Sequence, residues 1–152
     1  MSVGFGFSVG DFISAIELVG TVIDALRSSG SVSTEYRELV SQLLSLQTAL
    51  LQVNRLEFDD AQYAEVIALR QAAALCQRTI DGFWKRVKGY QPHLGNDERE
   101  FEDSRINLKD KTKRRWMKVK WAVCKKEDVR RFQADLVGHT ESIQLLLTTV
   151  QM

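Results

Sequence analysis

The sequence predicts an all-α protein, an antiparallel bundle of four long helices plus a shorter one. Three observations support this fold class. Apolar residues recur at alternating spacings of three and four over long segments, which is typical of helices that pack against helices. No segment has the strict alternation of a half-buried strand. The stretch SSGSVST and, later, Gly89, the single proline Pro92 and Gly95 fall between the periodic segments, where such residues end helices.

Size and composition are those of one soluble domain. The chain has 152 residues, 44% of them hydrophobic and 27% charged, with a net charge of +1. It is long enough to bury a core, and we expect residues 1–152 to form a single domain. Cys76 and Cys124 form no metal or redox motif and no signal peptide is recognisable, which favours a reducing, cytoplasmic location.

The first predicted helix lies in the stretch GFGFSVGDFISAIELVGTVIDALRSSG. Ser8 and Asp11 resemble a capping box, and the helix then runs to about Ser28. On a helical wheel one broad apolar arc holds Phe12, Ala15, Ile16, Leu18, Val19, Val22, Ile23, Ala25 and Leu26. The opposite side is polar and holds Ser14, Glu17, Gly20, Thr21, Asp24, Arg27 and Ser28, with Ile13 as the apolar exception.

The acids in this helix exclude two simple interpretations. A secretion signal has basic residues before an uninterrupted apolar run, and this segment has neither. A ready-made membrane span is excluded because each acid at the bilayer centre costs about 2.5–3.5 kcal/mol. The sequence therefore predicts an amphipathic helix with an unusually wide apolar face.

Two further long helices follow. The first runs from about Thr34 to Leu56, and its apolar seam is Tyr36, Leu39, Leu43, Leu46, Leu50 and Val53, widened by Val40, Leu44 and Leu51. Asp59 and Gln62 form a plausible capping box for the next helix, which ends near Lys88. Its seam has the same spacing and consists of Val66, Leu69, Ala73, Cys76, Ile80, Phe83 and Val87.

The region after Pro92 has a divided charge. Residues 93–111 read as an irregular connection, in which residues 97–103 hold five acids and one base. Residues 105–126 hold ten bases and one acid. Within them KTKRRWMKVKWAVC predicts a short helix with Trp116, Val119 and Val123 along one side. The last helix starts near Lys126 or Glu127, and its seam is Val129, Phe132, Leu136, His139, Ile143, Leu146 and Val150.

The basic run is the candidate binding site for anionic lipids or for a protein partner. It consists of Lys113, Arg114, Arg115, Lys118, Lys120, Lys125 and Lys126, interleaved with Trp116, Met117 and Trp121. Near an anionic leaflet each such cation contributes ~1 kcal/mol. We expect no nucleic acid, because no base-reading motif accompanies the run. The alternative is a solvated helix face that pairs with the acids of residues 97–103.

We find no pattern of an enzyme, and we expect no cofactor and no metal. The glycines at positions 4, 6 and 10 lack the spacing and the preceding strand of a dinucleotide-binding motif, and there is no Walker A sequence or zinc-ligand cluster. His139 lies in the seam of the last helix, where two roles are open. It could act as a pH switch, but a core histidine with one satisfied hydrogen bond is the commoner case.

Two stretches resemble the fungal HeLo-like domain, the N-terminal domain of many fungal NLR-like (STAND) signalling proteins. They are GFGFSVGDFISAIEL at the start and KVKWAVCKKEDVRRFQADLVGHTESI near the end, and the resemblance covers the chain in order, with a variable middle. It implies a helical bundle akin to the HeLo domain and to the four-helix domain of the necroptosis pseudokinase.

The resemblance also implies a function, programmed cell death. In those relatives an activated oligomer pushes its N-terminal segment into a membrane, and here that segment is Val3 to about Leu26. Its membrane-inserting residues would be Phe5, Phe7, Phe12, Ile13, Ile16, Glu17, Val19 and Asp24. Glu17 and Asp24 would then have to line a wet lumen while the apolar arc faces lipid.

The expected partners follow from this function. They are further copies of the chain on activation, anionic lipids of the plasma membrane, and C-terminal regulatory domains of a longer protein, since LLLTTVQM carries the helical pattern to the last residue. The alternative is a non-lytic adaptor module for homotypic or partner interactions. The sequence leaves both functions open.

Overall fold

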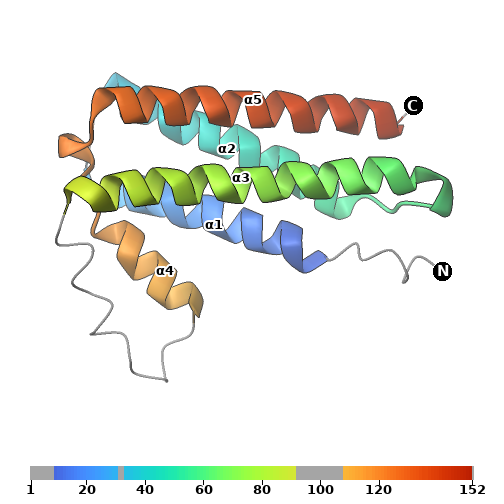
Figure 1. Ribbon diagram of the computed structural model, residues 1–152, viewed down its shortest axis with the longest axis horizontal. Helices are drawn as coiled ribbons and strands as arrows, with labels where there is room; N and C mark the ends of the chain where they lie inside the picture. The colour runs from blue at the N-terminus through green and yellow to red at the C-terminus, as the bar shows by residue number, and fades with distance from the viewer. Residues whose placement is uncertain (1–8, 31–32, 92–107, 152) are drawn as a thin grey trace.

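The computed structural model is an all-α bundle, as predicted (Figure 1). It describes residues 9–30, 33–91 and 108–151, and these ranges contain no strand. The helices are α1 (Val9–Ser28), α2 (Thr34–Arg55), α3 (Tyr63–Tyr90), α4 (Leu108–Met117) and α5 (Lys126–Gln151), with the short 3-10 helices η2 (Asp60–Gln62) and η5 (Trp121–Val123).

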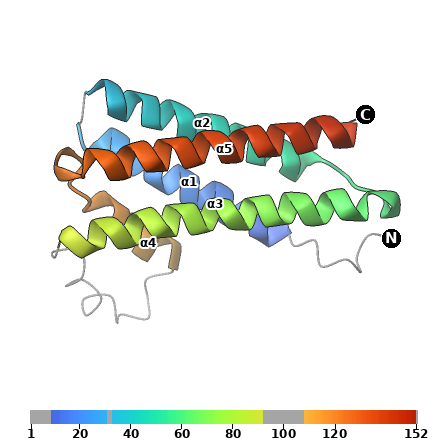
Figure 2. The ribbon, with the colours of Figure 1, turned by 45° about the horizontal axis from the view of Figure 1, so that its top comes forward.

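The four long helices form a ring in which α1 and α5 occupy opposite corners. Helix α1 packs against α2 and α3, and α5 packs against the same two helices. Helix α4 covers α1 from the outside. Figures 1 and 2 show α1 and α3 running in one direction and α2 and α5 in the other. The α1–α2 and α3–α5 pairs are therefore antiparallel, while the neighbours α1–α3 and α2–α5 run parallel.

Helix α1 buries its wide apolar arc, as its periodicity predicts. Phe12, Ala15, Val19 and Val22 have no exposed surface, and Ile16 and Leu18 are partly buried. Ile13, the apolar exception on the polar side, is 42% exposed.

Thr21 differs from the expectation, because the structure buries it although it was assigned to the polar side. Its hydroxyl donates to the carbonyl oxygen of Glu17 at 2.9 Å. This bond within the helix satisfies the hydroxyl, so the side chain can be buried at little cost.

The seams predicted for α2 and α3 lie in the core, apart from Tyr36, which is partly buried. Leu44 and Leu51 do not widen the core face as expected, since each is 36% exposed. The capping box is present: Ala61 donates to the Asp59 carboxylate at 3.0 Å, and Asp59 donates to the Gln62 side chain at 3.2 Å. It opens the single turn η2, and α3 follows directly.

The short helix predicted over residues 111–124 is wrong in its bounds. Helix α4 begins at Leu108, inside the stretch expected to be irregular, and ends at Met117. Peptide groups three residues apart bond there, Lys118 to Arg115 and Val119 to Trp116, each at 3.2 Å, and such bonds tighten a last turn. The chain then bends into η5, so that Val123 is 61% exposed instead of lying beside Trp116.

Candidate functional site

The basic end of the bundle is the end at which α3 and α4 stop and α2 and α5 begin (Figure 1). A cluster of aromatic side chains fills its interior. Phe83 of α3 is at the centre, with its ring centroid 4.4 Å from that of Phe132 and 5.7 Å from that of Trp121. Trp116 of α4 lies 5.1 Å from Trp84 of α3. This cluster joins α3, α4, η5 and α5 into one rigid platform.

Gln91 fixes the loop between α4 and α5 to the end of α3. Its side chain is 3% exposed. The amide Oε1 accepts from the Lys120 peptide N–H at 3.0 Å, and the amide Nε2 donates to the Lys120 carbonyl oxygen at 3.1 Å. One side chain therefore satisfies both peptide groups of a residue 29 positions away.

Two tyrosines hold the same loop. The Tyr36 hydroxyl of α2 donates to the carbonyl oxygen of Trp121. The Tyr90 hydroxyl accepts from the Lys125 peptide N–H at 3.2 Å, and the Lys125 ammonium lies 4.9 Å from the Tyr90 ring centroid. Burial raises the pKa of both phenols to about 12, so both stay protonated at physiological pH.

The basic run belongs to the segments that this aromatic cluster holds together. Lys113 and Arg114 of α4 are exposed, as are Lys120, Lys125 and Lys126, while Arg115 and Lys118 are partly buried. Their aromatic neighbours behave differently: Trp116 and Trp121 are in the core, and Met117 is 43% exposed. The basic run thus presents charged side chains to solvent, while its two tryptophans are buried in the aromatic cluster. The acids of residues 97–103, proposed as its pairing partners, lie outside the described residues.

The structure adds cations that the sequence analysis missed. Helix α3 ends at this end of the bundle with Lys85, Arg86 and Lys88, and Arg130 and Arg131 belong to the first turns of α5. The antiparallel packing of α3 and α5 carries both groups to the basic end. The charge pattern of the α3 terminus was visible in the sequence, but the pairing of these two helices was not.

The predicted membrane-inserting residues divide into two groups. Phe12 and Val19 are in the core and Ile16 is partly buried, whereas Ile13, Glu17 and Asp24 are exposed. Phe5 and Phe7 lie outside the described residues. In the bundle α1 therefore already presents one face to protein and an acidic face to water.

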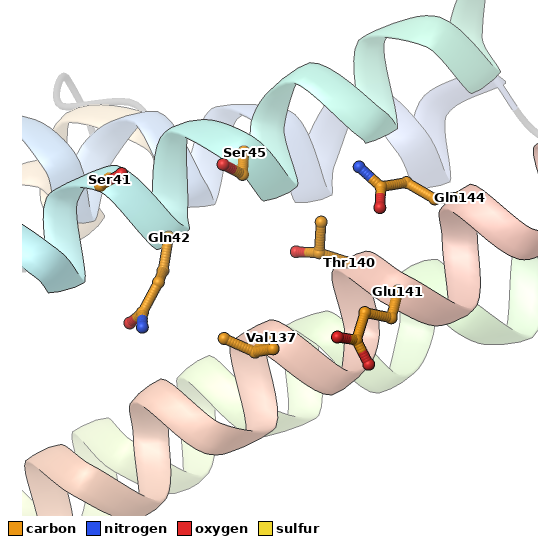
Figure 3. A pocket seen from close by; sticks show the side chains of 7 residues that line it. All are labelled: Ser41, Gln42, Ser45, Val137, Thr140, Glu141 and Gln144. Carbon is orange, nitrogen blue, oxygen red and sulfur yellow. The ribbon is translucent and has the colours of Figure 1, made fainter.

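A small polar cavity of about 240 Å³ separates α2 from α5 (Figure 3). Its lining consists of Ser41, Gln42, Ser45, Val137, Thr140, Glu141 and Gln144. Thr140 donates to the Leu136 carbonyl oxygen at 2.8 Å. The Gln42 Oε1 atom is buried and has no hydrogen-bond partner in the part of the chain that the structure describes. The volume of the cavity is below that of most ligand sites.

A second hollow of about 650 Å³ opens at the basic end. It lies between the turn after α1 and the first residues of α2 and α5, and its lining includes Ser33, Tyr36, Cys124 and Lys126. Burial raises the pKa of the Cys124 thiol, which disfavours the reactive thiolate form.

His139 is half-buried between α5 and α3. Its Nε2 forms a 2.6 Å hydrogen bond with the Thr79 hydroxyl, which is the arrangement expected of a core histidine. Over residues 9–30, 33–91 and 108–151 there is no group of three or more His, Cys, Asp or Glu side chains that could hold a metal ion.

Among the described helices, none has the length and apolarity that crossing a membrane requires. Comparison of the chain with protein-family models, with curated proteins and with solved structures gave no match. The resemblance to the HeLo-like domain therefore stays a prediction from the sequence.

Proposed function

We propose that the chain is the N-terminal effector domain of a fungal NLR-like signalling protein, and that α1 enters a membrane after oligomerisation to cause cell death. The observation that carries the proposal is the two-faced burial of α1. One face, with Phe12 and Val19, has no exposed surface, while Glu17 and Asp24 are exposed. A helix with these faces suits a pore wall, with its apolar arc toward lipid and its acids toward water.

The basic end supports the same proposal, because it offers a site for anionic lipid on the resting domain. Lys113 and Arg114 of α4 are exposed, as are Lys120, Lys125 and Lys126 after it, and α4 covers α1. Docking of this end on an anionic leaflet would concentrate copies of the domain on one surface. Concentration in two dimensions favours the oligomer that α1 release requires.

Release of α1 from a single copy is unfavourable. Five large apolar side chains of α1, Phe12, Val19, Val22, Ile23 and Leu26, are at most 3% exposed. At 1.5–3 kcal/mol each, their burial contributes about 8–15 kcal/mol, which is as large as the whole stability of a typical domain. The bundle is therefore dormant until an oligomer or a bilayer receives the apolar arc.

A covalent lock on α1 tests the proposal. The Gln47 amide nitrogen of α2 lies 3.1 Å from the position that a Cβ on Gly20 would take. The variant Gly20→Cys/Gln47→Cys can therefore be joined by a short thiol crosslinker. We expect the clustered, uncrosslinked variant to release dye from vesicles of phosphatidylserine and phosphatidylcholine, and the crosslinked variant to bind the same vesicles without release.

Each single-cysteine variant treated with the crosslinker is the control, since it carries the chemistry without the lock. The native thiols do not interfere, because Cys76 and Cys124 are buried. Equal dye release with and without the lock would contradict a role for α1, as would no release from clustered domain that binds the vesicles.

A second candidate function is a non-lytic adaptor, and the rigidity of the bundle favours it. Helix α1 has most of its apolar arc in the core, and three side chains, Tyr36, Gln91 and Tyr90, fix the loop between α4 and α5. An adaptor predicts a stable homotypic or partner complex that is indifferent to lipid. Charge reversal at Lys113, Arg114 and Arg115 separates the candidates, because it would abolish vesicle binding by an effector and leave an adaptor complex assembled.

A further inference from the structure

Charge is distributed unevenly along the axis of the bundle, although the whole chain is nearly neutral. The half that contains the basic end comprises residues 22–30, 33–43, 77–91 and 108–140, and it holds 17 bases and 8 acids. The other half comprises residues 9–21, 44–76 and 141–151, and it holds 2 bases and 7 acids. The described part of the molecule is thus an electric dipole along its long axis.

Two hydrogen bonds between segments show which helix ends lie together at each end of the bundle. Gln133 near the start of α5 donates to the Glu35 carbonyl oxygen near the start of α2 at 2.9 Å. At the other end, Gln62 before α3 donates to the Val150 carbonyl oxygen near the end of α5 at 3.3 Å. Figure 2 shows the first turn of α1 in the half of the bundle toward that second end, set back from the last turn of α5.

The effect of this uneven charge at a charged membrane depends on the length of the bundle relative to the Debye length. Helix α5 has 26 residues, which is about 39 Å at 1.5 Å per residue. The Debye length in physiological salt is about 8 Å, so only charges close to a membrane feel its potential. If the bundle lay flat, the acids of the far half would be repelled by anionic lipid, whereas an upright bundle keeps them several Debye lengths away.

We infer that the domain docks on anionic membrane standing on its basic end, with the acidic end and the first turn of α1 farthest from the lipid. The inference rests on the lipid docking proposed above and adds its geometry. Lys120 and Lys126 then meet the headgroups, with α4 beside them, and the apolar arc of α1 stays in the core. The buried aromatic cluster around Phe83 holds the loop between α4 and α5, and with it this contact surface, in a fixed conformation.

This geometry makes docking and membrane insertion separate steps. Helix α1 has 20 residues, so its two ends are about 30 Å apart, and its last turn is the one near the membrane. A docked copy cannot insert the start of α1 without turning over or opening the bundle. Docking by itself therefore does not permeabilise the membrane, and a second event on the membrane has to reorient the domain.

Two variants, each with one added cysteine, measure the orientation. Val123 in η5 and Leu145 in α5 are exposed apolar residues, 61% and 69% exposed, and the changes Val123→Cys and Leu145→Cys leave every charge in place. Leu145 is 19 residues beyond Lys126 along α5, or about 28 Å. Each variant carries an environment-sensitive fluorophore and is mixed with phosphatidylserine–phosphatidylcholine vesicles that contain a headgroup-linked quencher, while sedimentation reports binding independently.

We expect quenching of the probe at position 123 and an unchanged signal from position 145 while both variants sediment with the vesicles. The variant Lys120→Glu/Lys126→Glu should lower the partition onto vesicles by at least about tenfold. The matched change Arg55→Glu, in the acidic half, should leave the partition unchanged within twofold.

Other outcomes overturn the inference in distinguishable ways. Equal quenching of both probes means that the bundle lies flat, and quenching only at position 145 means that it is inverted; both results leave lipid docking intact. Failure to bind anionic vesicles overturns the orientation together with the proposed docking. A salt-sensitive rise in mass without vesicles would show that the basic end receives the acidic end of a second copy instead of lipid.

Discussion

The Thr79 hydroxyl of α3 and the His139 Nε2 of α5 lie 2.6 Å apart, in a half-buried contact between two antiparallel helices. Burial lowers the pKa of His139 below its ordinary value of 6.5, and the nearby Asp135 carboxylate opposes this shift. The folded domain therefore favours the neutral imidazole. This contact links the stability of the bundle to pH.

The first prediction concerns that link. The unfolded chain binds a proton at His139 near pH 6.5 while the folded chain resists it, so stability is lost as the pH falls through 6.5 toward the lower folded pKa. The variant His139→Gln should lose less unfolding free energy than the wild type between one pH unit above and one below 6.5, as measured by urea titration. Thr79→Ser keeps the hydroxyl and should keep the wild-type pH dependence; an unchanged dependence in His139→Gln would contradict the prediction.

The second prediction concerns the Gln91 side chain. The change Gln91→Ala leaves the Lys120 peptide N–H without its side-chain partner, while the Lys120 carbonyl oxygen keeps the hydrogen bond from the Val123 peptide N–H at 3.2 Å. An unsatisfied group that is shielded from water costs about 1–3 kcal/mol. We expect a loss of about 1–3 kcal/mol in unfolding free energy. The matched change Gln71→Ala, at an exposed position within α3, should cost less than about 0.5 kcal/mol. Similar losses in both variants would contradict the assigned role.

The long helices and their core residues could be predicted because their signal is local. Seven positions of α3, Val66, Leu69, Ala73, Cys76, Ile80, Phe83 and Val87, repeat with the helical period, and all are buried. The Asp59–Gln62 capping box is a pattern of four residues and is present. Such features depend on neighbours within a few residues, so the sequence contains them directly.

The loop between α4 and α5 could not be predicted because its contacts are distant in the chain. Lysines alternate with Trp116 and Trp121 in the sequence, which resembles one amphipathic helix. The chain instead bends at Lys120, where the side chain of Gln91, 29 residues earlier, bonds to both peptide groups of Lys120. The parallel packing of α1 with α3 and of α2 with α5 likewise depends on tertiary structure. The periodicity of each helix is the same whether it packs parallel or antiparallel to its neighbour.

The sequence predicted only part of the basic end. Residues 105–126 stood out as a run, but Lys85, Arg86 and Arg130 did not belong to it. The α3–α5 packing brings these groups to one end, and only then does the polarity of a nearly neutral chain become apparent.

The third prediction concerns the two thiols. Cys76 has no exposed surface and burial raises its pKa to about 12, and Cys124 is 8% exposed with a raised pKa. The thiolate is the reactive form, so the folded domain should react with a chromogenic disulfide reagent orders of magnitude more slowly than the same domain in urea. The Val123→Cys variant adds an exposed thiol and should show one fast reaction per chain. Rapid reaction of the native thiols in the wild type would mean that the core is open.

The last prediction tests whether the dormant bundle is held together through α1. Phe12 and Ile13 are neighbours in the sequence, yet Phe12 has no exposed surface and Ile13 is 42% exposed. Phe12→Ala removes a fully buried aromatic ring and should lower the unfolding free energy by about 3–5 kcal/mol, whereas Ile13→Ala should cost less than about 1 kcal/mol, because much of its side chain is already in water. Urea titrations followed by circular dichroism measure both values. If α1 were only loosely attached, the two changes would cost nearly the same, and a helix so weakly held would need no oligomer to release it. A large gap between the two values would instead mean that any membrane activity has to overcome the core contacts of α1 first.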